Sequence, residues 1–437
     1  MNGGNWGNGG NAGLFYLNAN NAPSNANSNI GCRLAMEDWA RSGAATAAPT
    51  VPHPSGAHSC LIGDEQKPGD AAGKVPVASP TLFERIVAWD NLVAAYREAR
   101  KGKRQSQEVA AFDADAFANL VDIHEHLLRG TWQPGQARRF WVRDPKWREI
   151  TAPPFPDRIV HHAIVRIIEP LFERRFVHDS YACRRGKGTH AAVRRTQSFL
   201  RGAVRTWSRP YIVKVDVKSY FASIDHDVLL RQMSRVVRDD RVLALLRTVY
   251  SGYGFSGVGL PVGALTSQLA ANILLDVIDH KVKDDLGVRY YVRYMDDMVA
   301  VVSGKNAARS LLGRIALELA ALGLRVNPKS GIWPAARGVD FCGYRIFHAH
   351  IRPRKRCLCA WKKRFAALRR RHESGQATLG QCRQRVMSFL AVMRHANAWR
   401  TSASILSRFT LGASHAHHRR SSSDRQFPVL QPPVFAC

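Results

Sequence analysis

The 437 residues include 64 Lys and Arg against 34 Asp and Glu, a formal net charge of +30, and 45% of the residues are hydrophobic. The chain can build a core, but it has no apolar run of the ~18 residues that a membrane span needs, no signal peptide, and eight cysteines without regular spacing. These features exclude a membrane protein and a disulfide scaffold. We expect a cytoplasmic protein with reduced thiols and a nucleic-acid partner.

The two ends of the chain differ in character from its middle. Ten of the first thirty residues are Asn and six are Gly, so we expect a disordered leader and linker over residues 1–80. A disordered tail is expected over 411–437. From Ile351 onward there are 18 Lys and Arg against two acids, which favours a groove for a nucleic-acid backbone over an ordinary solvated face.

The middle of the chain alternates between helical and strand patterns. Apolar spacing predicts helices over 81–135. Phe140–Arg143 and Arg148–Ile150 then suggest a hairpin, and 157–168 is typical of an amphipathic helix. Two adjacent histidines in that helix diverge by about 100°, so structural or RNA-facing roles are favoured over a shared metal.

An Asp-Asp pair joins two strand-like runs. Asp296 and Asp297 lie between Val288–Tyr294 and Met298–Val302, and this position indicates a hairpin tip that pushes both carboxylates into solvent. A solvated turn would also accept two acids, but a third one, Asp216, ends another β-rich run. Three carboxylates at neighbouring strand ends would suit Mg²⁺ with substrate phosphates. Two such ions can support an in-line displacement, which is the chemistry of nucleotidyl transfer.

Seven blocks of sequence accompany these acids in a fixed order. They are Lys146–Ile150, Ser180–His190, Lys214–Asp225, Gly259–Gln268, Tyr294–Asp297, Asn327–Lys329 and Phe341–Gly343. With them the chain resembles a reverse transcriptase from about Thr81 to about Trp399. The resemblance implies an α+β right-hand polymerase fold. Its N-terminal helices and fingers would span 81–210, its palm, an antiparallel sheet with helices, 211–350, and its short, basic, helical thumb 351–410.

The resemblance also implies roles at the reacting centre. Asp216, Asp296 and Asp297 would hold two Mg²⁺ ions, with the backbone carbonyl of Val217 as a further ligand. Asp297 is the least certain ligand of the three. Lys329 matches the lysine proposed in related polymerases as proton donor to the departing pyrophosphate.

Further residues match the positions that bind dNTP, template and primer. Arg148 would grip the triphosphate through its planar guanidinium, with Lys146 as a second contact. Phe221 would be the steric gate that selects deoxynucleotides, and an ordinary core aromatic is its alternative. The template path would be lined by Arg184, Lys187 and Gly188 and the primer grip would include Gly343.

Val262 departs from the commonest pattern of the family. Retroviral and group II intron enzymes carry Gln there, whereas an aliphatic residue is the pattern of diversity-generating retroelement enzymes. Together with Gly263 and Gln268 it would form part of the nucleotide pocket. Exchanging a hydrogen-bonding side chain for Val removes a polar readout and leaves only shape, so we expect lower fidelity. The Asn-rich leader also resembles a translated template repeat of such an element; a meaningless Asn/Gly tail, or a start codon placed too far upstream, is the alternative.

The leading interpretation is an RNA-directed DNA polymerase of a diversity-generating retroelement. It would copy a template RNA from a primer into adenine-mutated cDNA, with dNTPs as substrates and a small basic accessory protein as partner. A retron-like or phage-defence reverse transcriptase is the nearest alternative, although Tyr-Ala-Asp-Asp is more common there. A catalytically silent nucleic-acid-binding scaffold is the alternative of another class, and three intact acids argue against it. The short thumb, with no endonuclease block after it, argues against a self-sufficient mobile intron enzyme.

Overall fold

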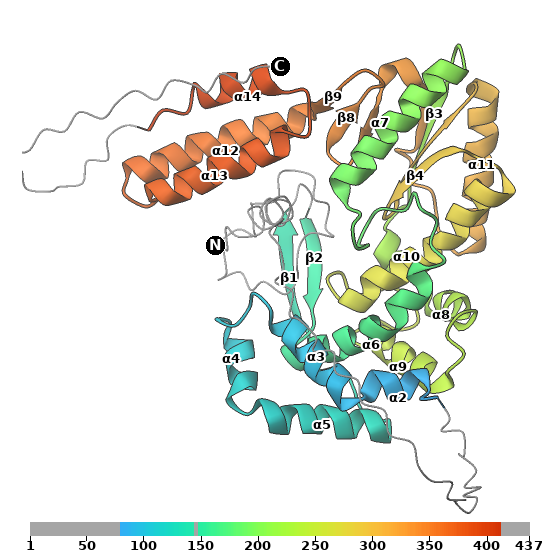
Figure 1. Ribbon diagram of the computed structural model, residues 1–437, viewed down its shortest axis with the longest axis vertical. Helices are drawn as coiled ribbons and strands as arrows, with labels where there is room; N and C mark the ends of the chain where they lie inside the picture. The colour runs from blue at the N-terminus through green and yellow to red at the C-terminus, as the bar shows by residue number, and fades with distance from the viewer. Residues whose placement is uncertain (1–78, 144–146, 412–437) are drawn as a thin grey trace, which may run out of the picture.

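The computed structural model describes residues 79–143 and 147–411 (Figure 1). The Asn-rich leader up to residue 78, the tail from residue 412 and Lys146 lie outside these ranges, and the expectations for them stay predictions. In the ranges that are described, no helix is both long enough and apolar enough to cross a membrane.

The predicted helical region on the N-terminal side forms four helices. They are α2 (Leu82–Val87), α3 (Trp89–Arg100), α4 (Gln107–Ala114) and α5 (Ala116–Arg129). The first begins at Thr81, whose hydroxyl accepts from the Glu84 N–H while the Glu84 carboxylate accepts from the Thr81 N–H, a capping box. Helix α6 (Phe155–Glu173) packs along α3 and contains the predicted amphipathic helix.

The predicted hairpin is confirmed. Strands β1 (Arg138–Arg143) and β2 (Trp147–Ala152) pair antiparallel. Because side chains alternate along a strand, Phe140 and Val142 point to one face, where they pack with Ile150 and Val262 in a small apolar cluster. In Figure 1 this hairpin stands upright between the N-terminal helices and the C-terminal helices.

A four-stranded antiparallel sheet forms the centre of the molecule. Its strands are β3 (Tyr211–Asp216), β4 (Tyr290–Tyr294), β5 (Asp297–Val302) and β6 (Gly331–Pro334), in the order β4-β5-β3-β6. Helix α7 (Thr189–Thr206) packs along β4 and β5, and α11 (Lys305–Ala321) packs along β3 and β6. Every residue of β4 is buried, as expected for a strand covered on both faces.

Three more helices connect the sheet to the N-terminal layer. They are α8 (His226–Ser234), α9 (Asp240–Ser251) and α10 (Leu265–His280). The last of these is mostly buried and packs against α6, α8 and α11. One hydrophobic core therefore runs from the N-terminal helices through α10 to the sheet.

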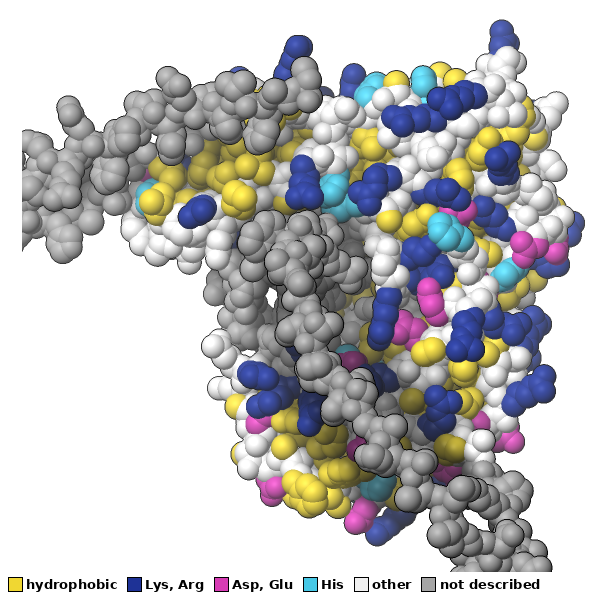
Figure 2. Space-filling view, in the orientation of Figure 1, with side chains coloured by type: hydrophobic (Ala, Val, Ile, Leu, Met, Phe, Trp, Pro, Cys, Tyr) yellow, Lys and Arg dark blue, Asp and Glu magenta, His cyan; other side chains and the backbone are white. Residues whose placement is uncertain are grey.

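The C-terminal part has a core of its own. A small sheet of β7 (Val339–Phe341), β8 (Tyr344–Ile346) and β9 (Ile351–Pro353) leads into α12 (Lys355–Glu373), α13 (Leu379–Met393) and α14 (Trp399–Leu406). Trp361, Phe365 and Phe389 form the centre of these helices. The presence of α12, α13 and α14 confirms the helices that were predicted for this basic segment. Figure 2 shows Lys and Arg side chains spread over the upper body of the molecule near α7 and β8, with few acids among them.

Candidate active site

The backbone brings the three predicted aspartates to one edge of the central sheet. Asp216 ends β3 and pairs directly with Asp297, the first residue of β5. Met295 and Asp296 form the tip between β4 and β5, and Met295 adopts a φ of 54°, in the left-handed region that is costly for a residue with a side chain. The hairpin is confirmed, but both acids of the pair are half-buried instead of pushed into solvent, because neighbouring segments cover the tip.

Burial and mutual repulsion dominate the electrostatics of Asp296. Burial, together with the nearby carboxylates of Asp216 and Asp297, raises its pKa to about 7. The positive charge of Arg148 acts in the opposite direction on the pKa of both Asp296 and Asp216. Arg148 therefore lies near the aspartates, as predicted for a triphosphate contact, and it extends from the exposed end of β2.

Asp297 is paired with a lysine of the neighbouring strand. Its Oδ2 lies 3.0 Å from Nζ of Lys214, and its Oδ1 is buried without a hydrogen-bond partner. Within residues 79–143 and 147–411, no three His, Cys, Asp or Glu side chains form a ready-made metal site. In this conformation the Lys214 ammonium therefore holds one of the three carboxylates that are predicted to bind Mg²⁺.

A turn distant in sequence fixes Asp216. Asn327 donates from Nδ2 to Oδ2 of Asp216 at 2.6 Å and from its backbone N–H to the Asp216 carbonyl at 2.7 Å. Ser330 accepts from the Asp216 N–H at 3.0 Å. The same turn carries Lys329, which is exposed and whose charge lowers the pKa of Asp216 against the raising effect of burial. The sequence predicted a role for Lys329 in this turn, but it did not predict that Asn327 binds Asp216.

We expect Asn327→Ala to slow primer extension by about 10- to 100-fold, because a hydrogen bond to a charged group contributes roughly 1.5–3 kcal/mol. The change should reduce kcat with little effect on the KM for dNTP, since Asn327 orients Asp216 and is not predicted to contact the nucleotide. Asn119→Ala is the matched control, because its amide bonds the Phe112 carbonyl in the N-terminal helices. A variant that keeps full kcat would show that Asp216 needs no such support.

The predicted nucleotide-binding residues lie on adjoining segments. Phe221 is half-buried against the core, and its carbonyl accepts from the Leu260 N–H at 2.8 Å, which ties the predicted gate to the loop before α10. Val262 in that loop packs against Ile150 of the β1–β2 hairpin. Gly263 has a φ of 116°, which only Gly adopts readily, and Gln268 is half-buried on α10.

The predicted template residues have different fates. Arg184 is not available to a phosphate, because its side chain is only 5% exposed and its guanidinium forks onto Glu173 and donates to two backbone carbonyls. This prediction was wrong. Lys187 lies 4.9 Å above the Tyr181 ring, Gly188 precedes α7, and Gly343 forms the turn between β7 and β8 with a φ of 95°.

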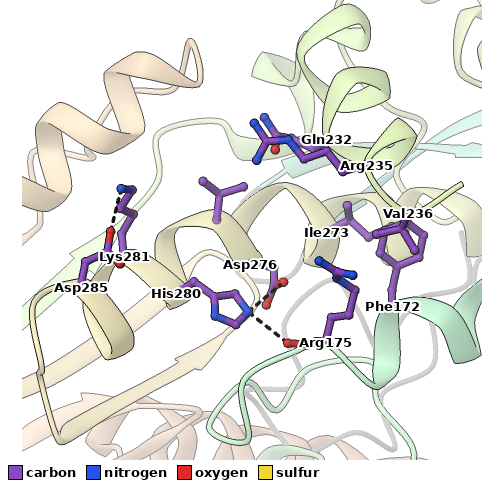
Figure 3. Close-up of a pocket in the computed structure, with 11 residues that line it drawn as sticks. Phe172, Arg175, Gln232, Arg235, Val236, Ile273, Asp276, His280, Lys281 and Asp285 are labelled. Carbon is purple, nitrogen blue, oxygen red and sulfur yellow. Dashed lines mark hydrogen bonds and ion pairs between the residues drawn. The ribbon is translucent and has the colours of Figure 1, made fainter. Parts of the chain in front are cut away.

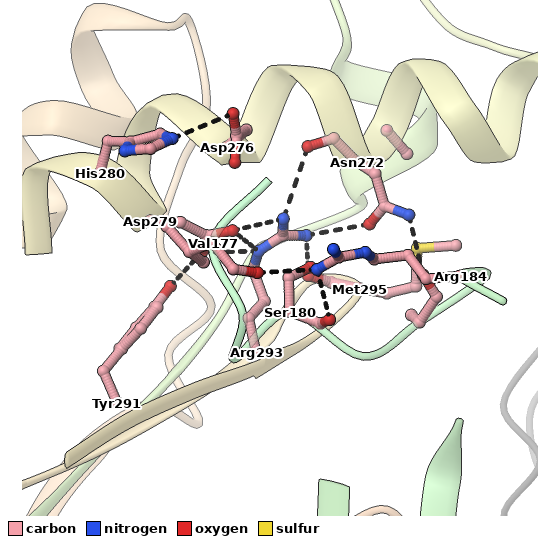
Figure 4. A network of polar contacts seen from close by, with 12 residues as sticks. Val177, Ser180, Arg184, Asn272, Asp276, Asp279, His280, Tyr291, Arg293 and Met295 are labelled. Atoms are coloured by element: carbon pink, nitrogen blue, oxygen red, sulfur yellow. Dashed lines mark hydrogen bonds and ion pairs between the residues drawn. The ribbon is translucent and has the colours of Figure 1, made fainter. Parts of the chain in front are cut away.

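A buried ion pair contacts the backbone of Met295, which immediately precedes the Asp-Asp pair (Figure 4). Arg293 and Asp279 are both completely buried, and Nε and Nη2 of the arginine bind the carboxylate at 2.6–2.8 Å. Nη1 donates to the Met295 carbonyl at 3.1 Å, and Tyr291 donates its hydroxyl to the same carboxylate. Sequence reasoning missed this pair, although an arginine inside a buried strand signals a buried acidic partner.

An open cavity of about 350 Å³ lies between α6, α8 and α10 (Figure 3). Asp276 and His280 line it, and burial raises the pKa of Asp276 to about 6. None of the predicted catalytic, nucleotide or template residues lines this cavity. It is therefore separate from the aspartate site.

Comparison with known proteins agrees with this geometry. The family model described as reverse transcriptase (RNA-dependent DNA polymerase) matches residues 142–346. Protein YkfC of Escherichia coli (strain K12) is 30% identical over 277 residues, which cover 53% of this chain and 72% of that protein. The chain belongs to the reverse transcriptase family.

Two further likenesses are more distant. The reverse transcriptase is 26% identical over 213 residues to the group II intron-encoded protein LtrA of Lactococcus lactis subsp. cremoris, covering 45% of this chain and 34% of that protein. This chain therefore spans about a third of the length of LtrA. A solved structure of apo telomerase from Candida tropicalis matches with a TM-score of 0.43 at 10% identity, covering 62% of this chain and 59% of that one.

Family membership confirms the predicted fold class and enzyme class. The reverse transcriptase has the α+β right-hand polymerase fold, and it is an RNA-directed DNA polymerase by class. The site predicted from the motifs lies inside the matched residues 142–346.

Proposed function

We propose that this reverse transcriptase copies a template RNA into cDNA by two-metal nucleotidyl transfer and serves a diversity-generating retroelement. The observation that carries the polymerase chemistry is that Asp216, Asp296 and Asp297 lie together at one sheet edge. Arg148 is close enough for its positive charge to lower the pKa of Asp296. The feature that favours the retroelement is Val262, at a position that the resemblance to the family assigns to the nucleotide pocket.

The aspartate site fits Mg²⁺ in two respects. Asp296 is raised in pKa by burial and by its neighbours, and the Oδ1 atom of Asp297 is buried without a partner. A divalent cation would offset the repulsion among the carboxylates that raises the pKa of Asp296, and it would give Oδ1 of Asp297 a partner. Asp216 and Asp296 would be the principal ligands, with Asp297 and the Val217 carbonyl completing the set, and the two ions would activate the primer hydroxyl and stabilise the departing pyrophosphate.

The remaining roles belong to the chain's own side chains. The Arg148 guanidinium would hold the triphosphate, and Lys329 would give a proton to the leaving pyrophosphate. The Phe221 ring would lie under the sugar and exclude a 2′-hydroxyl. Arg184 takes no part, because Glu173 and two carbonyls occupy its guanidinium.

The surroundings of Val262 give the low-fidelity hypothesis a physical basis. Val262 is half-buried and packs with Phe140, Val142 and Ile150, so the loop before α10 and the β1–β2 hairpin meet through an apolar contact. Such a contact offers no hydrogen bond to the base or sugar edge. Selection at this point would then depend on shape alone, which tolerates mispairs of similar size.

We expect Val262→Gln to lower misincorporation opposite template adenines by about fivefold, because one net hydrogen bond contributes about 1 kcal/mol. Val262→Ile is the matched control, since it keeps the apolar contact and should leave the error rate unchanged. The measurement is sequencing of cDNA made on a defined RNA template. An equal error rate in Val262→Gln would sink the explanation by lost polar readout.

One experiment tests the proposed function as a whole. The full chain would extend a primer on an RNA template with Mg²⁺, with and without a small basic accessory protein encoded nearby, and the cDNA would be sequenced. Errors concentrated opposite adenines would support the retroelement. Accurate extension would favour a retron-like or phage-defence enzyme, or an intron enzyme, to which the likeness with LtrA points. Absence of extension in every condition would favour a silent nucleic-acid-binding scaffold.

A further inference from the structure

Two tryptophans of the β1–β2 hairpin are exposed in a way that folding does not explain. The side chains of Trp141 and Trp147 are 63% and 61% exposed, whereas Trp132 and Trp361 are buried in the cores of the molecule. Large aromatic side chains in water cost hydrophobic free energy that burial would recover. Exposed apolar surface of this kind marks a binding site when it is clustered, so the arrangement of the pair matters.

The strand register places both rings on one face. Trp141 pairs with Glu149, and Arg143 pairs with Trp147, so these four side chains form two adjacent rows on the face opposite the Val262 cluster. We call this the outer face of the hairpin. The two tryptophans are diagonal neighbours, at a Cα spacing of roughly 7–8 Å, close to twice the roughly 3.4 Å spacing of stacked nucleotides.

The charges of the outer face favour a polyanion. The Arg143 guanidinium lies 5.9 Å from the Trp147 ring centroid, so a cation and a stacking surface are presented together. The whole chain carries a net charge of +30, which adds to the attraction for a polyanion. Glu149 is the acid of this face.

We propose that the outer face binds the single-stranded template RNA by stacking unpaired bases on Trp141 and Trp147 while Arg143 contacts a phosphate. The assignment rests on the proposed function, because it needs an RNA template. It goes further by naming a second binding surface, on the side of the hairpin away from Arg148 and the aspartates.

Stacking is what selects a single strand over a duplex. Unpaired bases offer their flat faces to aromatic rings, whereas a duplex hides them and is contacted through its backbone. The hairpin's inner face is occupied by the packing of Ile150 with Val262, whereas the two tryptophans of the outer face remain exposed. The surface would accept any sequence, as a template path requires.

The test compares two ligands of the full chain by fluorescence anisotropy without dNTP. One is an RNA–DNA duplex with a single-stranded RNA overhang on the template strand, and the other is the same duplex with blunt ends. In the variant Trp141→Ala/Trp147→Ala, the Kd for the overhang ligand is expected to rise at least about tenfold, and the Kd for the blunt ligand should stay within about twofold.

Three variants sharpen the comparison. Trp141→Phe/Trp147→Phe should keep most of the overhang affinity and guards against misfolding of the alanine pair. Glu149→Gln should tighten overhang binding, since it removes a negative charge. Phe117→Ala is the matched control, because Phe117 is 71% exposed on α5 and should not affect either ligand.

The outcomes separate this proposal from the proposed function. Equal weakening of both ligands, or no weakening of either, overturns the stacking surface, and the second result assigns the tryptophans to a protein partner. Tryptophan-dependent overhang binding by a chain that extends no primer would support the surface and contradict the polymerase role. Normal extension with tryptophan-independent binding would do the reverse.

Discussion

Asp296→Asn is expected to reduce primer extension by about a thousandfold or more. Asp296 is the carboxylate most strongly affected by burial and like charge, and it lies beside Asp216 at the sheet edge. The neutral amide of the substituted asparagine would bind Mg²⁺ weakly. Stabilisation of the charge that develops in the transition state by a metal ion contributes several kcal/mol. Since each 1.36 kcal/mol is a factor of ten in rate, a loss of ~4 kcal/mol gives the expected magnitude.

The same substitution should leave the fold intact or slightly more stable. Removing one charge relieves repulsion within the cluster, so the thermal midpoint should not fall, and affinity for a primer–template duplex should be kept. Asp122→Asn is the control, because Asp122 is 73% exposed on α5. Extension at the wild-type rate by Asp296→Asn would remove Asp296 from the reaction and favour the scaffold interpretation.

Local patterns predicted the elements that position the site. Alternating and β-branched runs predicted the β1–β2 hairpin, β3 and the β4–β5 hairpin, because period-two patterns reflect the strand geometry itself. Helical spacing predicted α6 in the same way. The order of the motifs then carried the fold class, which the reverse transcriptase match confirms.

Contacts between distant segments could not be predicted from these patterns. Asn327 reaches Asp216 across 111 positions of sequence, and the contact of Lys214 with Asp297 depends on which side chains share a sheet face. Arg184 shows the opposite error. It lies in a basic, glycine-containing segment typical of a phosphate contact, yet Glu173, 11 positions earlier, returns from α6 to neutralise it. Composition does not show how a chain folds back on itself.

Asp279→Ala is expected to destabilise the protein by about 3–5 kcal/mol, because it would leave the Arg293 guanidinium buried without its counter-ion. The midpoint of urea unfolding is the measurement. Glu318→Ala is the control, since its partner Arg314 is 56% exposed and such surface pairs contribute about 1 kcal/mol or less. A small effect of Asp279→Ala would mean that water or another group reaches Arg293.

Replacing both partners separates stability from positioning. Arg293→Met/Asp279→Leu fills the volume without charges and should recover most of the lost stability, because the cost lies in leaving one ion unpaired. It should not recover activity, since the Arg293 donation to the Met295 carbonyl is gone and Met295 holds a left-handed conformation immediately before Asp296. A stable double variant with low kcat and unchanged duplex affinity would show that the buried pair orients the catalytic tip. Full extension by that variant would reduce the pair to a role in folding.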